Sequence, residues 1–339
     1  MRSNAFQPRR PAAIAIAIAM SAMFAMSVMS LCAASATVFA QSWPVKPVRM
    51  VVPYPPGGST DISARLIAEA TGKSLGQNVL VDNRPGAGGM LGMELVARAA
   101  PDGYTQIVSA DSAVYQPTIR TNVRWAIKDF APVSQLVSQP IILAVNPGLG
   151  VNSVADLVRL AKAQPGGITY GTGSASGTQT LAAAVFADAA GIKLRHVPYK
   201  GGAQAGNDLA GGHINAAFLG SGPLMAFYRS GRVRLLAVTS KERSPSLKDV
   251  PTIAESGFHD VDITQWFGML APAGTPAAIV NRMQVEIARA MAQPDLRDKL
   301  LQTALDPVGS TPQAFAARIE SESKLWARAV KELGMPIED

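Results

Sequence analysis

Two short stretches of the chain have the composition of anion-binding turns. Residues 54–61 (YPPGGSTD) and 171–178 (GTGSASGT) are rich in glycine and hydroxyl side chains, and each lies between an apolar run and a helical pattern. Glycine lets a ligand approach the backbone, while serine and threonine donate hydrogen bonds. A helix N-terminus adds unpaired N–H groups and partial positive charge. This combination binds phosphates and carboxylates.

Two further turns have related compositions. Residues 198–202 (PYKGG) follow an apolar run and precede a helical pattern, and Lys200 adds a positive charge there. Residues 109–112 (SADS) also follow an apolar run, although no clear helix pattern begins after them. Because such turns gather at the carboxyl edge of a parallel sheet, we expect all four to surround one cleft. A dicarboxylate held between turns of two lobes suits this arrangement.

The alternative is that each turn only caps its helix, and for any single turn that explanation is the simpler one. Three helix-opening turns in one chain favour a ligand site instead. The candidate ligand-binding residues in these turns are Tyr54, Pro56, Gly57, Gly58, Ser59, Thr60, Asp61, Ser109, Asp111, Ser112, Thr172, Ser174, Ala175, Ser176, Gly177, Thr178, Tyr199, Lys200 and Gly201. For Asp61, a cap in the first helical turn is favoured over a contact with a ligand hydroxyl or ammonium group.

The sequence matches three motifs of catalysis or cofactor binding in part, but none of them completely. A hydrolase elbow needs G-x-S-x-G, but Ala175 stands where the nucleophile belongs. A dinucleotide-binding motif needs G-x-G-x-x-G; Gly171 and Gly173 fit its start, but Ser176 stands where the last glycine belongs. A phosphate-binding loop needs G-x-x-x-x-G-K-[ST]; residues 72–74 fit its end, but Ile67 stands where the first glycine belongs. We therefore expect no enzyme and no cofactor.

A metal site is not expected either. Cys32 is the single cysteine, and His196, His213 and His259 have no partner at a metal-ligand spacing. His196 ends an apolar strand pattern, so a packed histidine is favoured over a ligand.

Apolar runs alternate with helical patterns along the chain, which predicts α/β architecture. One unit spans about residues 48–109, and a second begins near residue 140. Two helical patterns in the tail each begin with Thr-Pro, at Thr275 and Thr311, a typical N-cap followed by proline at the first helical position. We expect lobe 1 over residues 41–140, lobe 2 over 141–262, and a return to lobe 1 over 263–339.

Residues 1–40 have the pattern of a secretory signal peptide. Arg2, Arg9 and Arg10 precede an apolar stretch that ends at small residues, which predicts cleavage after Ala40. A membrane anchor is the less favoured alternative. Three of the 31 basic residues and no acidic residue lie in 1–40, which leaves a formal charge of +4 on the rest. That weak, scattered charge excludes a nucleic-acid partner and suits a small anion.

Motifs along nearly the whole of residues 43–335 resemble the Bug/TctC solute receptors of tripartite tricarboxylate transporters. The matching stretches are residues 53–61 (PYPPGGSTD), 83–89 (NRPGAGG), 101–105 (PDGYT), 197–201 (VPYKG), 236–240 (LAVTS), 250–257 (VPTIAESG), 266–268 (WFG) and 271–276 (APAGTP). The resemblance implies a periplasmic receptor with the type II periplasmic-binding-protein (Venus flytrap) fold. We expect the receptor to be a monomer. The resemblance also implies that the loops at 54–61 and 172–178 hold a carboxylate, which the receptor delivers to a membrane permease of two subunits.

Two positions depart from the family pattern. Thr180 stands where the second loop usually continues with histidine, and Leu219 stands where an aspartate often follows the strand at 215–218. Leu219 therefore joins the candidate ligand-binding residues. Loss of both polar groups predicts a ligand whose far end is apolar or aromatic.

Two other functions stay open from the sequence. A sensor that presents its ligand to a membrane kinase would have the same fold and pocket. An exported serine hydrolase would use Ser174 or Ser176 with His196 as its base, although no family pattern supports it.

Overall fold

The structure is a computed structural model that describes residues 43–337. The predicted signal peptide and its cleavage after Ala40 lie outside the described residues. The architecture below is that of the unit that begins at residue 46. Among the described residues, no helix combines the length and the apolar character that a membrane span needs.

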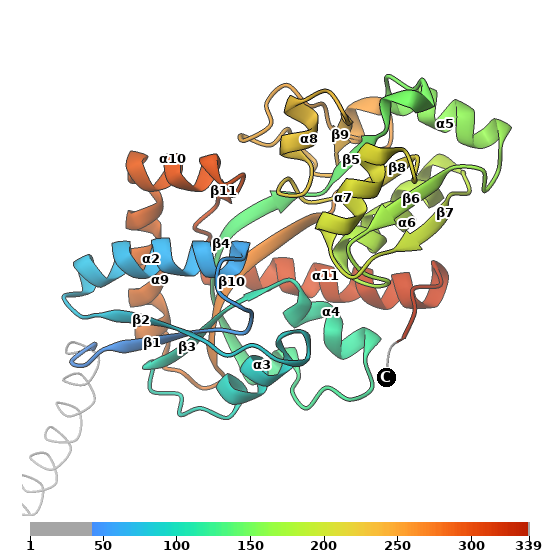
Figure 1. Ribbon diagram of the computed structural model, residues 1–339. Coiled ribbons are helices and arrows are strands. Elements are labelled where there is room, and N and C mark those ends of the chain that lie inside the picture. The colour runs from blue at the N-terminus through green and yellow to red at the C-terminus, as the bar shows by residue number, and fades with distance from the viewer. Residues whose placement is uncertain (1–42, 338–339) are drawn as a thin grey trace, which may run out of the picture. The chain divides into compact units, whose positions relative to one another are not determined.

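The first lobe is built on a six-stranded mixed sheet (Figure 1). In spatial order its strands are β11 (Asp306–Pro307), β4 (Phe130–Pro140), β10 (Thr264–Pro272), β3 (Thr105–Ala110), β1 (Val48–Val52) and β2 (Val79–Asn83). Strand β1 is parallel to both β2 and β3, whereas β10 is antiparallel to β3 and β4. The helices of this lobe are α2 (Ser59–Leu75), α3 (Met90–Ala97), α4 (Ser112–Ile119), α9 (Ala277–Met291), α10 (Pro294–Gln302) and α11 (Pro312–Glu332).

The second lobe is built on a five-stranded mixed sheet. In spatial order its strands are β7 (Arg195–Pro198), β6 (Thr169–Thr172), β8 (Ala216–Leu219), β5 (Ile142–Val145) and β9 (Arg234–Val238). Its helices are α5 (Val154–Ala163), α6 (Thr178–Ala190), α7 (Gly202–Gly211) and α8 (Met225–Arg229). The two-lobed α/β fold with mixed sheets, expected from the sequence, is confirmed. The domain boundaries at residues 140 and 262 stay a prediction.

Alternating side chains on the central strands of the second sheet bury both of its faces. On β5, Leu143 and Val145 pack into one apolar cluster with α5 and α6, while Ile142 and Ala144 pack into another with α7. This follows from the two-residue period of a strand. Because both faces are covered, these strands read in the sequence as continuous apolar runs.

The two lobes are joined through neighbouring strands. Strand β4 leads almost directly into β5, and β10 brings the chain back beside β4 along its whole length. Thr239, just after β9, bonds to both segments that connect the lobes. Its backbone N–H donates to the Ile141 carbonyl between β4 and β5, and its hydroxyl donates to the Ile263 carbonyl just before β10. Helix α11 packs against α4 and β4 and reaches the second lobe at α6, where Arg328 pairs with Asp188 at 3.7 Å (Figure 1).

Several local expectations need correction. The sequence shows no clear helix pattern after residue 112, yet α4 forms there, and the tail contains α10 in addition to the two helices that begin with Thr-Pro patterns. Helix α4 is short and contains Pro117, so its own pattern is weak, and contacts with α11 stabilise it. Pro276 is the N-cap of α9 and not its first helical residue, which makes Thr275 a residue of the preceding turn. Thr311, in contrast, caps α11 as expected, with its hydroxyl accepting from the Ala314 N–H at 3.2 Å.

A close approach between β10 and α11 depends on Gly268. A Cβ atom added at Gly268 would lie 2.3 Å from Cζ of Phe315. Phe315 is fully buried and stands edge-on to Trp266, with ring centroids 4.9 Å apart. No side chain larger than hydrogen fits here without moving the helix.

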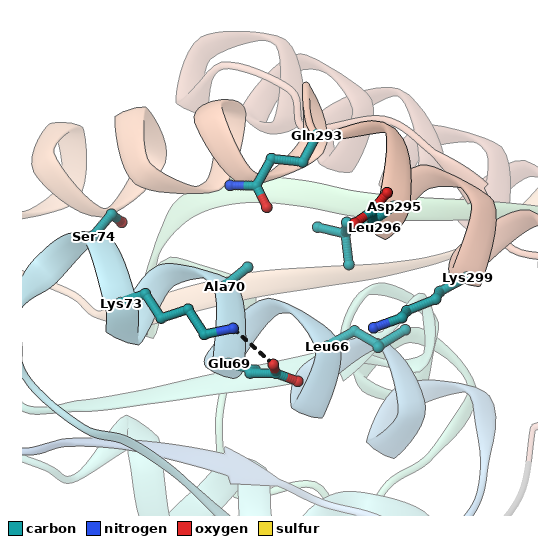
Figure 2. Close-up of a pocket in the computed structure, with 9 residues that line it drawn as sticks. All are labelled: Leu66, Glu69, Ala70, Lys73, Ser74, Gln293, Asp295, Leu296 and Lys299. Carbon is teal, nitrogen blue, oxygen red and sulfur yellow. Dashed lines mark hydrogen bonds and ion pairs between the residues drawn. The ribbon is translucent and has the colours of Figure 1, made fainter.

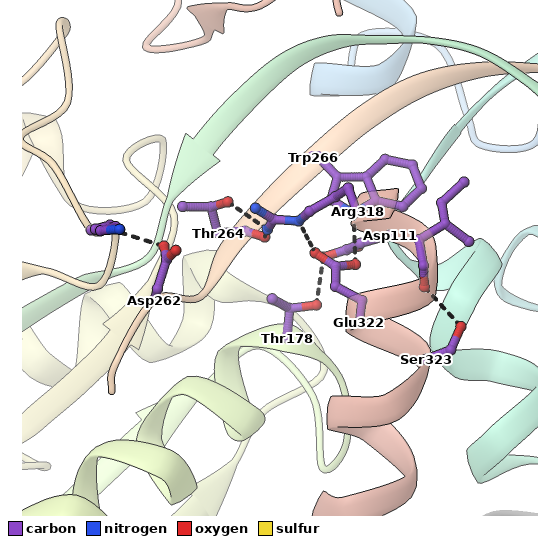
Figure 3. Close-up of polar contacts among 10 residues, drawn as sticks. Asp111, Thr178, Asp262, Thr264, Trp266, Arg318, Glu322 and Ser323 are labelled. Carbon is purple, nitrogen blue, oxygen red and sulfur yellow. Dashed lines mark hydrogen bonds and ion pairs between the residues drawn. The ribbon is translucent and has the colours of Figure 1, made fainter. Parts of the chain in front are cut away.

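Buried carboxyl groups gather where the lobes meet (Figure 3). Asp111, after β3, accepts a hydrogen bond from the Thr178 hydroxyl at the start of α6, with Oγ1 2.5 Å from Oδ2. Glu322 of α11 accepts from the Trp266 indole at 2.7 Å and from Arg318 at 2.6 Å. Burial, followed by the charge of Glu322, raises the pKa of Asp111 to about 7. Burial also raises the pKa of Glu322, against the opposing effect of Arg318.

We predict that Gly268→Ala destabilises the protein by about 1–3 kcal/mol, because the added methyl group overpacks the contact with Phe315. Urea unfolding followed by tryptophan fluorescence measures this free energy of unfolding. Gly222→Ala is the matched control, since a Cβ atom there meets nothing within 4 Å. Equal stability of both variants would contradict the packing argument.

We predict that Asp111→Asn flattens the pH dependence of stability. An aspartate with a raised folded-state pKa stabilises the fold fully below its unfolded pKa, and this contribution is lost as the pH rises through about 7. The loss amounts to about 4 kcal/mol at most, from a shift of roughly three pKa units. Melting temperatures from pH 5 to pH 8 should fall less in Asp111→Asn than in the parent. Parallel curves for the two proteins would exclude this role of Asp111.

Candidate functional site

The loop between β1 and α2 is held in shape by one buried carboxylate. Asp61 accepts hydrogen bonds from the Gly57 N–H, the Arg65 guanidinium and the Asn83 amide, each at 2.9 Å. Asn83 also donates to the Tyr54 carbonyl at 3.1 Å. Burial raises the pKa of Asp61, but the bonds from Arg65, Gly57 and Asn83 outweigh it and lower the pKa overall. Asp61 thus holds in shape the loop that precedes α2, because it accepts from Gly57, the residue before the N-cap Gly58; the cap in the first helical turn that the sequence favours stays a prediction.

The loop between β6 and α6 is supported from beneath by hydroxyl groups. Thr172 and Thr180 both donate to the Ser174 carbonyl, at 2.6 Å and 3.1 Å. The Gly173 N–H donates to the Gln179 side chain at 2.8 Å. Thr180, which replaces the usual histidine of the family pattern, is buried and therefore orders the loop from its inner side. Gly177 caps α6 with φ of 115°, a conformation that only glycine adopts without strain.

Two adjoining cavities share Gly88 and Tyr115; the first is lined by residues of the first lobe, and the second by residues of both lobes. The inner cavity, of about 280 Å³, is lined by Tyr54, Ser59, Thr60, Gly88, Ala110, Asp111, Ser112, Tyr115, Gln139, Gln265 and Phe267. The outer cavity, of about 470 Å³, is lined by Gly88, Tyr115, Gln116, Arg120, Gly173, Ser174, Ala175, Ser176, Pro198, Tyr199 and Lys200. Together they form a cleft bounded by loops of both sheets.

About half of the residues predicted from the sequence line this cleft. Those that do are Tyr54, Ser59, Thr60, Asp111, Ser112, Ser174, Ala175, Ser176, Tyr199 and Lys200. Others belong to the same loops without lining either cavity: Pro56, Gly57, Gly58, Asp61, Ser109, Thr172, Gly177, Thr178 and Gly201. Thr172 and Ser109 are fully buried beneath the loops, while Gly57 and Gly58 lie on the exposed outside of theirs.

The expectation for Leu219 needs correction. It is fully buried in the core of the second lobe, and its side chain faces Gly202 at the start of α7. Phe218 points to the opposite face of the sheet, so the strand period directs Leu219 into the α7 side of the core. Leu219 therefore lines neither cavity.

The residues that β4, β10 and α4 contribute to the cleft were not predicted from the sequence. Gln139 of β4 and Gln265 and Phe267 of β10 form the floor of the inner cavity, and Tyr115 and Gln116 come from α4. Gln139 also donates to the Ser221 hydroxyl of the second lobe at 3.1 Å. The only available signal was the polar glutamines inside otherwise apolar strand patterns.

The geometry gives no support to a serine hydrolase. His196 Nε2 lies 2.7 Å from the Thr172 hydroxyl, and its ring stacks on Tyr170 with centroids 4.8 Å apart. Burial lowers the pKa of His196, as expected of a packed histidine. The Ser174 hydroxyl instead donates to the Ser176 carbonyl. Among the described residues, no group of three or more His, Cys, Asp or Glu side chains has the arrangement of a metal site.

A third cavity, of about 380 Å³, lies on the first lobe between α2 and the start of α10 (Figure 2). Its lining includes Glu69, Lys73, Asp295 and Lys299, so positive and negative charges balance. Glu69 and Lys73 pair at 2.9 Å, and this contact lowers the pKa of Glu69. The groove lacks the excess of positive charge and the glycine-rich loops of the cleft.

Comparison with known proteins agrees with this architecture. Residues 63–335 match the model of the tripartite tricarboxylate transporter family receptor, TctC. Protein BugT of Bordetella pertussis is 35% identical over 306 residues, which cover 88% of this chain and 93% of BugT. The crystal structure of a TctC solute-binding protein from Polaromonas has a TM-score of 0.77 and 31% identity, covering 86% of this chain and 99% of that one.

A further solved structure contains a ligand. R. palustris Rpa4515 with adipate has a TM-score of 0.73 and 33% identity, covering 87% of this chain and 99% of that protein. The family match spans most of the described chain, and both structures share the two-lobed α/β fold. The chain therefore belongs to the Bug/TctC family of tripartite tricarboxylate transporter receptors and is a periplasmic solute-binding protein with the Venus flytrap fold.

Proposed function

We propose that this receptor captures a small carboxylate in the cleft between its lobes and delivers it to a membrane permease of two subunits. The observation that carries the proposal is the pair of ordered glycine- and hydroxyl-rich loops that border adjoining cavities from opposite lobes. Adipate, the ligand in the Rpa4515 structure, is a carboxylate of the expected size.

The loops suit a carboxylate because their own polar groups are ordered from the inside. Asp61 occupies the Gly57 N–H and draws the β1–α2 loop inward, so the first N–H groups of α2, near Ser59 and Thr60, remain for a ligand. Gly58 caps α2 without a side-chain hydrogen bond, and Gly177 does the same for α6. Two helix N-termini without side-chain caps therefore flank the cleft, and both favour negative charge.

Export by a signal peptide cleaved after Ala40 and a monomeric state complete the proposal. A receptor that releases its ligand unchanged needs no nucleophile, and the Ser174 hydroxyl donates to the Ser176 carbonyl.

We predict that one class of carboxylic acids raises the melting temperature of the purified receptor, after unfolding and refolding to remove any carried-over ligand. A ligand at a hundred times its dissociation constant stabilises a protein by about 2.7 kcal/mol, which corresponds to several degrees. The panel comprises aliphatic dicarboxylates, citrate, aromatic acids, acidic amino acids and neutral sugars. Stabilisation by a sugar without any response to the acids would refute the carboxylate proposal.

We predict that Asp61→Asn weakens carboxylate binding by about tenfold, because an amide replaces the charged acceptor of three hydrogen bonds that order the loop. Isothermal titration calorimetry with the best acid from the panel measures the change. Glu69→Gln is the control, since it removes an exposed carboxylate from the same helix outside the cleft. If both variants bound the acid as tightly as the parent, the β1–α2 loop would not be the carboxylate site.

A further inference from the structure

The inner cavity has no basic side chain to balance a bound anion. Among the described residues that line it, none is Lys, Arg or His, and its hydrogen-bond donors are hydroxyl and amide groups. Of the same lining residues, Asp111 alone carries a carboxyl group, and it is 2% exposed. A carboxylate bound beside the β1–α2 loop shares this cavity with Asp111, and two carboxyl groups in one site do not both ionise readily.

The Asp111 carboxyl group is only partly satisfied by its hydrogen bonds. Its Oδ2 atom lies 2.5 Å from the Thr178 hydroxyl at the start of α6, which donates to it from the second lobe. Its Oδ1 atom is buried and has no hydrogen-bond partner among the described residues. A buried carboxylate with an unpartnered oxygen is costly, because the charged form loses more hydration than the neutral acid does.

Helix α11 places two charged groups near Asp111 (Figure 3). Glu322, whose side chain is 12% exposed, accepts from Arg318 at 2.6 Å, so this cation is already paired with another carboxyl group. Asp262, just before β10, adds a negative charge that acts on Glu322. Arg318 therefore faces more than one carboxyl group and offsets the charge of Asp111 only in part.

The other titratable groups that line the inner cavity, in the described part of the chain, are phenols. Tyr54 belongs to the β1–α2 loop and Tyr115 to α4. Burial, with a further contribution from the charge of Asp111, raises the pKa of Tyr54, so this phenol stays neutral around pH 7. Since phenols ordinarily titrate near pH 10, Asp111 is the lining group whose charge changes around neutral pH.

A bound anion shifts the protonation of Asp111 further. Burial, followed by the charge of Glu322, raises the pKa of Asp111 to about 7. The Thr178 hydroxyl, Arg318 and the Ser112 N–H oppose this rise. A ligand carboxylate in the same cavity adds another negative charge and raises the pKa again. Once protonated, Asp111 no longer repels the ligand and can donate its O–H to the ligand carboxylate.

We propose that Asp111 takes up one proton from solvent when a carboxylate binds in the inner cavity, so that the receptor holds its ligand more tightly in mildly acidic than in alkaline medium. This rests on the proposed carboxylate-binding function and specifies the regulation of the same site. The proton cancels one negative charge as the ligand carboxylate brings one in. Asp111 thereby serves in place of the basic side chain that the lining of this cavity does not provide.

The sign of the pH dependence follows from linkage. Well below pH 7 the unbound receptor already carries the Asp111 proton, so binding takes up none and the affinity is constant. Above pH 7 the unbound receptor is ionised and must gain a proton on binding. The apparent affinity then falls by up to about tenfold per pH unit, until the pH exceeds the pKa of Asp111 in the complex.

Calorimetric titration of the parent with adipate and with benzoate tests the coupling from pH 6 to pH 8.5, with a correction for the small protonated fraction of each acid. Titrations at pH 8 in HEPES and in Tris, buffers with different heats of ionisation, give the number of protons taken up per acid bound. We expect between about half a proton and one proton at pH 8, and an affinity about tenfold weaker at pH 8.5 than at pH 7.

Three variants assign the proton. Asp111→Asn keeps an acceptor for Thr178 and should bind with no proton uptake and with an affinity constant within about twofold across the range. Glu322→Gln keeps Asp111 but removes its negative neighbour, so the fall in affinity should move to lower pH. Asp306→Asn is the matched control, because Asp306 is another buried aspartate that accepts from a hydroxyl, Ser244 at 2.6 Å, but lines neither cavity. It should keep the pH profile of the parent.

Each result decides the matter. Binding by the parent without proton uptake, or uptake that persists in Asp111→Asn, would overturn the coupling and leave carboxylate binding intact. If Asp111→Asn does not fold, an unshifted profile in Glu322→Gln has the same meaning. A parent that binds neither acid, nor any acid of the melting-temperature panel, would overturn the proposed function and the coupling together.

Discussion

The pairing of β4 with β10 is the interaction on which the other features of this receptor depend. The two strands are hydrogen-bonded from Thr264 to Pro272, and they bring both passages of the chain between the lobes to one place. Thr239 and the close contact of Gly268 with Phe315 bind the second lobe and α11 to the same strands. The cleft forms over these strands, so Gln139, Gln265 and Phe267 become its floor.

Burial at this junction has an electrostatic consequence. Asp111 and Glu322 are both enclosed, and Arg318 is the cation that partly offsets them. The Thr178 hydroxyl crosses from the second lobe to Asp111, so a titrating group takes part in the contact between lobes. Because the pKa of Asp111 is about 7, the protonation of this carboxyl changes around neutral pH, and the stability of the contact between the lobes changes with it.

In this cleft, the residues that order the loops differ from the groups that are available to contact a ligand. Buried residues such as Asp61 and Thr180 order the loops and do not line the cavities, which leaves backbone groups and surface hydroxyls to meet a ligand. The basic side chains that line the cleft, Arg120 and Lys200, lie at the outer cavity, whereas Asp111 lines the inner one.

The sequence by itself determined the α/β class, most strands, the Thr311 cap and the two glycine-rich loops, because these depend on short-range periodicity and turn chemistry. Tertiary structure alone decided that α4 is helical, that Leu219 faces the core, and that β4 and β10 supply cleft residues. Each of these outcomes depends on contacts between segments far apart in the chain, such as the packing of α11 on α4. Local patterns do not indicate which distant strand will pair with a given strand, so the residues that β4 and β10 supply to the cleft could not be predicted from them.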